Sequence, residues 1–199
     1  MTRLTQFQSD IGRARDLVGL GQSIGSMTNG RVDASDMYRG GLVQAVAAMD
    51  AWVHGVVLDR AVSVLLGRLP SNVGDSKIGL RFGAVSELLA APTPAARELS
   101  ARSHLAQRLS RETYQRPDDI AAALAMVGVK KVWTNCFSSA VDAKARVGVV
   151  IDRRNRIVHS CDADPLTPGE VTPLTDVDAL TSIDTVDQTV TQIAAFVPM

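Results

Sequence analysis

DAKARVGVVIDRRNRIVHSC, the sequence from Asp142 to Cys161, has the periodicity of an amphipathic helix. It contains no proline and a single glycine, and its apolar residues recur at helical spacing. At about 100° per residue these side chains fall on one stripe, which predicts a helix packed with one face against a core. The stripe consists of Val147, Val150, Ile151, Ile157, Val158 and Cys161.

One charged residue interrupts this stripe. Arg154 lies between Ile151 and Val158. A guanidinium keeps its charge in such a position and is costly to bury without a partner. We therefore expect Arg154 either to extend out of the core along its aliphatic stem or to face an anion.

A second face of the same helix carries polar side chains. Asn155 and Asp152 precede His159 by four and seven residues, so the three share this face. Arg154 and His159 are five residues apart, roughly 140° around the axis, so one straight helix does not easily aim both at one atom. Two copies packed across a two-fold axis would bring both pairs to one groove, which favours a homodimer.

Residues Arg154–His159, with the sequence RNRIVH, match the pattern R-N-x-x-x-H and resemble the signature of the HEPN superfamily (higher eukaryotes and prokaryotes nucleotide-binding). The wider sequence resembles the branch called RiboL-PSP-HEPN. The matching features are DAWVH at 50–54, YQRPDDI at 114–120 and Trp133 ahead of the signature helix. The resemblance extends from about Asp36 to the C-terminus.

This resemblance implies a metal-independent endoribonuclease that works at a dimer interface and leaves 2′,3′-cyclic phosphate ends. His159 would act as a base or an acid and Arg154 would hold phosphate oxygens, roles that suit an imidazole and a guanidinium. Asn155 would orient His159 or contact the scissile phosphate. Such proteins commonly serve in toxin–antitoxin or antiviral systems, which implies RNA and a possible antitoxin or defence protein as partners.

Four further residues are candidates for binding the substrate. Arg153 and Arg156 flank the catalytic candidates on the same helix. Asp50 and His54 form an i,i+4 pair on an earlier helix and would reach the groove from there. The alternative for Asp50 and His54 is a buried pair in which each satisfies the other by hydrogen bonding.

A different class of function is also compatible with these residues. A histidine at a helix end often only interacts with the negative end of the dipole, and an arginine among aliphatic residues often only covers them with its stem. Some HEPN relatives are not nucleases, so the alternative is a non-catalytic HEPN-like dimerisation or nucleotide- or RNA-binding module. The presence of Arg154, Asn155 and His159 favours the enzyme.

The whole chain favours an all-α fold. Aromatic residues make up only 4% of its 199 residues, and no segment alternates with a period of two, which argues against a β-sandwich. We expect an up-and-down helical bundle of about five to six helices over 35–199, resembling HEPN domains. Residues 1–34 would contribute a short helix over 3–18 and a flexible Gly/Ser-rich linker over 19–30.

The charge distribution and the cysteines limit which ligands and partners we expect. Residues 161–199 carry seven acids and no Lys or Arg, so residues 1–160 hold 21 bases against 14 acids, a net charge of +7. That basic body suits RNA, although the acidic segment is equally explained as a solvated surface. The two cysteines, Cys136 and Cys161, have no zinc-site spacing. We expect no metal, no cofactor, no membrane-spanning segment and a cytoplasmic location.

Overall fold

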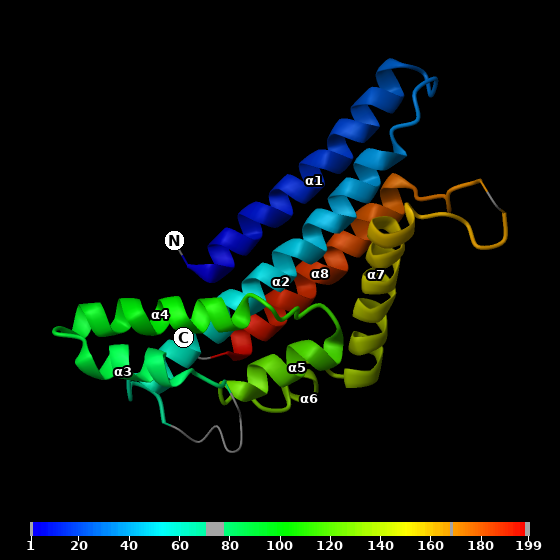
Figure 1. Cartoon of the computed structure of the whole chain (residues 1–199). Coiled ribbons are helices and arrows are strands. Elements are labelled where there is room, and N and C mark those ends of the chain that lie inside the picture. The colour runs from blue at the N-terminus through cyan, green and yellow to red at the C-terminus, as the bar shows by residue number, and fades with distance from the viewer. Residues whose placement is uncertain (1, 71–77, 168, 198–199) are drawn as a thin grey trace.

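The computed structural model describes residues 2–70, 78–167 and 169–197, and within them the chain is all-helical. This confirms the expected fold class (Figure 1). The described residues form eight helices rather than five to six. They are α1 (Arg3–Met27), α2 (Ser35–Leu65), α3 (Phe82–Ala90), α4 (Pro94–Leu109), α5 (Pro117–Met126), α6 (Val132–Cys136), α7 (Ala140–Ser160) and α8 (Asp176–Phe196).

The central helix is α2, which packs against α1, α4, α5, α7 and α8. Its residues Leu42, Val46, Met49 and Val53 are at most 1% exposed and belong to one core that the other helices share. By length and composition α2 is also apolar enough to cross a membrane, but 61% of its most apolar window is buried inside the bundle. Burial against its neighbours accounts for that composition.

The first helix is longer than expected, and the predicted linker over 19–30 is wrong for most of its length. Helix α1 continues through this glycine-rich segment to Met27 and lies along α2 (Figure 1). A Cβ atom on Gly21 would lie 2.6 Å from the Tyr38 ring, and one on Gly41 would lie 2.8 Å from the backbone of α1. These glycines therefore allow two helices to approach closely, rather than making the chain flexible.

Other boundaries differ by smaller amounts. Thr93 followed by Pro94 predicts a capped helix that runs to about Tyr114. The side chain of Thr93 does cap α4, but the helix ends at Leu109. The composition of residues 67–79 predicts a loop, which lies partly outside the described residues because these omit 71–77. A short helix, α6, precedes α7, and Thr175 forms a capping box with Asp178 in α8.

Helix α7 and its following loop position the candidate site. The side chain of Ser139 accepts a hydrogen bond from the Asp142 N–H and starts α7. The helix ends at Cys161 and Asp162, which both have positive φ, and the Asp162 N–H donates to the Arg156 carbonyl. In Figure 1 this end of α7 lies beside the beginning of α2, and the loop that follows projects away from the bundle.

Candidate functional site

Two opposite faces of α7 meet different surroundings. The side chains of Ala143, Val147, Val150 and Ile151 are buried against the bundle. On the other side, Val141 is 78% exposed and Val149 is 71% exposed. This second side, the outward face, comprises Val141, Ala145, Gly148, Val149, Asp152, Asn155, Arg156 and His159, which a period of 3.6 residues places together. Among the described residues nothing covers its apolar part, since Val141 and Val149 stay exposed.

Arg154 projects from the core side of α7 and is only partly buried. Within the described residues it forms no ion pair with a carboxylate. Its Nε atom is buried and has no hydrogen-bond partner. An arginine in this state keeps unused donors close to an apolar surface, an arrangement that suits an anionic ligand.

Asn155 connects Arg154 with the outward face. The Nη1 atom of Arg154 donates a hydrogen bond of 3.1 Å to Oδ1 of Asn155. Asn155 lies one turn before His159, which is exposed in the last turn of α7. The guanidinium therefore bends toward the side of the helix that carries the imidazole, which reduces the separation expected from their angular positions.

Arg153 has a different environment from Arg154 although the two are adjacent. Its Nη2 atom donates to Oδ2 of Asp162 at 2.7 Å and to the carbonyl of Thr172 at 2.8 Å. Arg39 donates to the same carboxylate oxygen at 3.0 Å and to the same carbonyl at 2.9 Å. The Asp162 side chain is 0% exposed. The structure thus uses Arg153 to join α7, α2 and the loop after α7.

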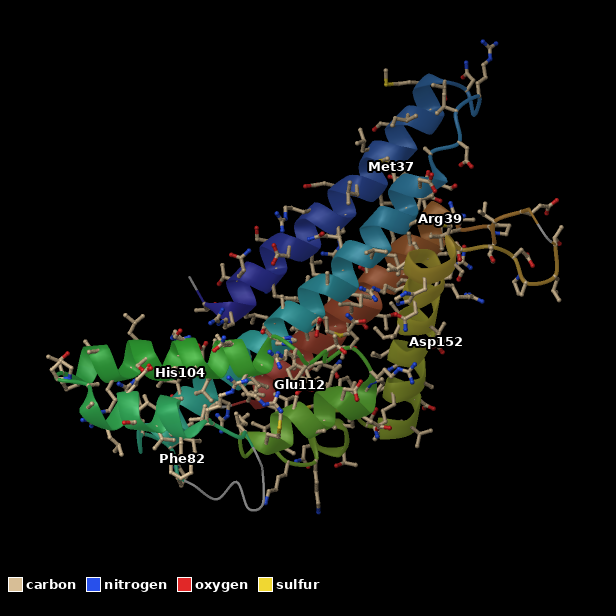
Figure 2. The ribbon with its side chains drawn as sticks, in the orientation of Figure 1. Met37, Arg39, Phe82, His104, Glu112 and Asp152 are labelled. Carbon is tan, nitrogen blue, oxygen red and sulfur yellow. The ribbon has the colours of Figure 1, made fainter. Side chains whose placement is uncertain are left out.

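This cluster of Arg39, Arg153 and Asp162 sets the position of the end of α7. Figure 2 shows Arg39 near the start of α2, beside the loop that follows α7. Oδ1 of Asp162 is buried without a hydrogen-bond partner. Removing Asp162 would take away the buried carboxylate that Arg39 and Arg153 share, although Arg39 would keep an exposed partner in Asp36. Sequence reasoning missed Asp162, because its partners lie 9 and 123 positions away and no periodic pattern links them.

Asp50 and His54 form a mutually satisfied pair. The His54 Nδ1 atom lies 3.3 Å from Oδ1 of Asp50, and Nε2 lies 3.1 Å from the carbonyl of Glu112. Oδ1 of Asp50 also accepts the backbone N–H of Tyr114 at 2.7 Å. Because both ring nitrogens face oxygen acceptors, the doubly protonated imidazolium satisfies the site best.

The pKa values of His54 and Asp50 shift in opposite directions. The hydrogen bond to Asp50 raises the pKa of His54 above its usual value, although burial acts the other way. Burial alone would raise the pKa of Asp50, but the hydrogen bonds from His54 and from the Tyr114 backbone outweigh it and lower that pKa. Both pKa shifts favour the charged form of the group, the imidazolium of His54 and the carboxylate of Asp50.

The structure does not bring this pair to His159. The cluster at the end of α7 contacts α2 at Arg39. Asp50 and His54 lie 11 and 15 residues further along α2, about 16 Å and about 22 Å by helical rise. They hold the connector between α4 and α5 instead.

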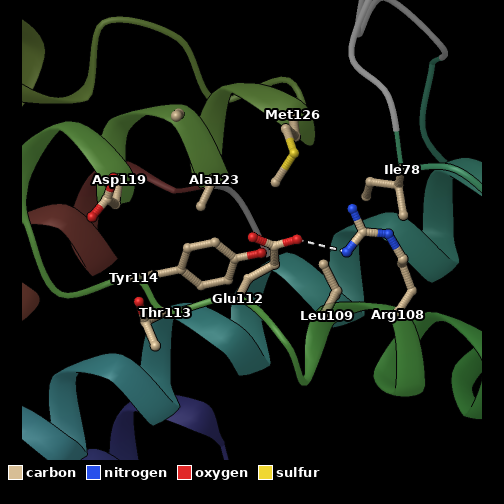
Figure 3. A pocket seen from close by; sticks show the side chains of 10 residues that line it. Ile78, Arg108, Leu109, Glu112, Thr113, Tyr114, Asp119, Ala123 and Met126 are labelled. Carbon is tan, nitrogen blue, oxygen red and sulfur yellow. Dashed lines mark hydrogen bonds and ion pairs between the residues drawn. The ribbon is translucent and has the colours of Figure 1, made fainter.

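Two cavities adjoin that connector. The first, of about 230 Å³, lies between the end of α4 and α5 (Figure 3). An ion pair of 2.6 Å between Arg108 and Glu112 borders it, and the Tyr114 hydroxyl beside it is buried without a hydrogen-bond partner. Ala123 and Met126 form part of its apolar wall.

The second cavity, of about 460 Å³, lies between the start of α5 and the middle of α7 and is called the α5–α7 pocket below. Asp152, which Figure 2 shows at the middle of α7, is one of its lining residues. Two of its lining residues, Gly148 and Asp152, belong to the outward face, which also carries His159. Its polar and small lining residues are Arg116, Asp118, Asp119, Lys144, Gly148 and Asp152.

Two points remain, the position of Arg156 and the possibility of a metal site. Arg156 is exposed and makes no side-chain contact with a carboxylate in the part of the chain that the structure describes. Among residues 2–70, 78–167 and 169–197, no three His, Cys, Asp or Glu side chains gather in a way that would hold a metal ion.

Comparisons with known proteins add no name to these observations. No family model matches the chain, and no curated protein and no solved structure is significantly similar to it.

Proposed function

We propose that this protein is a HEPN-like endoribonuclease, which cleaves RNA without a metal ion at a site shared by two copies of the chain. The observation that carries the proposal is the state of Arg154. Its guanidinium has no carboxylate partner among the described residues, and Asn155 holds it toward the side of α7 that carries His159. These are the three residues of the R-N-x-x-x-H pattern.

A second observation supports the shared site. The outward face of α7 combines exposed apolar residues, Val141 and Val149, with the exposed His159. Pairing of two such faces across a two-fold axis would bury the valines and would place two imidazoles along one groove. The guanidinium of each Arg154 would then border that groove through Asn155.

The chemistry that this arrangement supports is transesterification within RNA. One His159 accepts the proton of a ribose 2′-hydroxyl, whose oxygen attacks the adjacent phosphorus. The bond from phosphorus to the 5′-oxygen breaks, and the second His159 donates a proton to that oxygen. The products are a 2′,3′-cyclic phosphate and a 5′-hydroxyl. Arg154 stabilises the charge that develops on the phosphate oxygens.

A cleavage assay in the presence of EDTA tests the proposal. Purified wild-type protein, His159→Ala and Arg154→Ala are incubated with several structured and unstructured RNAs. We expect cleavage by the wild type, with 2′,3′-cyclic phosphate ends, and a loss of at least 100-fold in both variants, the order found when a general base or an oxyanion-stabilising donor is removed. The dimer should persist in both variants by size-exclusion chromatography with light scattering.

Equal background from all three proteins on every RNA would contradict the nuclease. Retained RNA binding in that case would assign the non-catalytic binding module instead. The proposed biology is a cytoplasmic toxin–antitoxin or antiviral role, with RNA, a second copy of the chain and an antitoxin or defence protein as partners.

A further inference from the structure

The α5–α7 pocket has the size of a small-ligand site. Its volume of about 460 Å³ falls in the range of about 300–1,000 Å³ that such sites occupy. One wall is the beginning of α5 with Asp118 and Asp119, and the other is the middle of α7 with Gly148 and Asp152. The pocket is thus formed by two elements that are far apart in the sequence and rigid in themselves.

Only some of the charged side chains in this pocket form ion pairs with one another. Lys144 forms an ion pair of 2.7 Å with Asp118, so these two charges offset one another. Asp119 and Asp152 form no ion pair with any described residue. Two free carboxylates repel a phosphate and instead accept hydrogen bonds from neutral donor groups.

A cation on the same pocket complements these carboxylates. Arg116 lines the same pocket, is exposed, and forms no ion pair within the described part of the chain. A nucleotide satisfies both requirements at once, because its base carries N–H donors while its phosphate is an anion. The base would enter between Asp119 and Asp152, and the phosphate would remain outside beside Arg116.

Hydrogen bonds from other elements hold the start of α5, which forms one wall of the pocket. The Asp50 carboxylate accepts the Tyr114 N–H at 2.7 Å, and the Trp133 indole donates to the Pro117 carbonyl at 2.8 Å. These bonds fix the chain on either side of Arg116, at Tyr114 and at Pro117. Asp50 is therefore a positioning residue for the pocket, although it lies away from His159.

The pocket is also at a useful distance from the proposed cleavage site. Asp152 and His159 share the outward face of α7 and are seven residues apart, about 10 Å by helical rise. A short length of extended single strand spans this distance. A base held at Asp152 would therefore fix which phosphate reaches His159.

We infer that the α5–α7 pocket is a base-recognition subsite that selects guanine near the scissile phosphate. Guanine presents an N1–H and an N2 amino group side by side, two donors that match one carboxylate in a bidentate contact. Uracil offers only one such donor. The inference rests on the proposed nuclease for its role, but binding at the pocket can be measured without cleavage.

Binding measurements test this subsite. The His159→Ala protein is titrated with fluorescently labelled oligonucleotides that contain only uridine, one guanosine or one inosine, which lacks the N2 amino group. We expect the guanosine oligonucleotide to bind about tenfold more tightly than the others, the discrimination typical of one bidentate contact. The substitution Asp152→Asn should abolish the preference, because the amide replaces one acceptor oxygen with an NH2 group, whose N–H donors would oppose one of the two donors of guanine.

Filling the pocket gives an independent test. A Cβ atom on Gly148 would meet nothing within 4 Å, so Gly148→Leu keeps the helix intact while projecting into the pocket. Gly83→Leu on α3, where a Cβ atom also meets nothing within 4 Å, is the matched control. We expect the guanosine preference to disappear in Gly148→Leu and to remain in Gly83→Leu, with both proteins folded by circular dichroism. Because Gly148 also lies on the outward face, both proteins should have the same mass as the wild type by light scattering.

The outcomes separate this inference from the proposed function. Cleavage of RNA with equal affinity for all three oligonucleotides, unchanged by Asp152→Asn and Gly148→Leu, overturns the subsite and leaves the nuclease. NMR titration of the wild type with 5′-GMP and 5′-UMP tests the pocket in the case that no RNA is cleaved. Asp152-dependent binding of GMP without any RNA cleavage supports the pocket and overturns the nuclease. Absence of any nucleotide binding overturns the subsite.

Discussion

The Nη1 atom of Arg154 donates a 3.1 Å hydrogen bond to Oδ1 of Asn155, the next residue in the chain. Neighbouring residues of a helix point in directions about 100° apart, so this contact requires the long arginine side chain to bend around the helix. The bond uses Oδ1 of Asn155 as acceptor and so does not engage the donor group Nδ2. Asn155 therefore links the guanidinium of Arg154 to the face of α7 that carries His159.

Substitution of Asn155 tests whether this contact serves catalysis. Asn155→Ala should lower RNA cleavage by about 10- to 100-fold, since a hydrogen bond to a charged group contributes about 1.5–3 kcal/mol. Asn155→Asp should lower it further, because a carboxylate there would pair with Arg154 and repel phosphate. Initial rates under single-turnover conditions measure both effects. Asn135→Ala, an exposed asparagine on α6, is the control and should keep full activity.

A charge on the outward face of α7 should dissociate the proposed dimer. In Val149→Arg a guanidinium would replace an apolar contact at the centre of the paired face, and like charges would oppose one another across the two-fold axis. Light scattering should change from twice the chain mass of 21.2 kDa to that mass, with loss of cleavage. Val177→Arg, at a 64% exposed position on α8, should leave the dimer intact. A wild-type protein that is monomeric at every concentration would exclude the shared site.

Removal of Asp162 should destabilise the fold strongly. Asp162→Ala leaves Arg39 and Arg153 without the buried carboxylate that pairs with both. The loss of one partner from a buried pair costs about 3–5 kcal/mol, which urea unfolding followed by circular dichroism will measure. Asp184→Ala breaks only a surface pair with Arg15 and should cost less than about 1 kcal/mol. Similar stabilities of the two variants would contradict the structural role of Asp162.

The Asp50–His54 pair should make stability depend on pH. Because the folded protein raises the pKa of His54, its contribution is complete below the unfolded value of about 6.5 and is lost as pH rises through the folded value. The lowered pKa of Asp50 acts only in acid, below about pH 4. The free energy of unfolding should therefore fall more between about pH 6 and pH 8 in the wild type than in His54→Gln. Parallel pH profiles of the two proteins would contradict this assignment.

Sequence periodicity predicted several elements because their causes are local. The apolar stripe of α7 and the cap at Thr93 depend on residues within a few positions of one another. The expected linker in α1 was wrong for a long-range reason. Gly21 faces the ring of Tyr38, so the glycine belongs to a helix crossing that no local pattern reveals.

In the candidate site, too, some features follow from the local sequence and others from tertiary packing. The sequence alone determined that Arg154, Asn155 and His159 lie on one helix, since helical spacing depends only on the chain itself. Only the tertiary structure decided that Arg153 is engaged by Asp162 while the adjacent Arg154 keeps no carboxylate partner among the described residues. It also brought the start of α5 against Gly148 and Asp152 to form a pocket. Such pairings arise from the packing of distant segments, and their energies depend on burial, which a linear sequence does not specify.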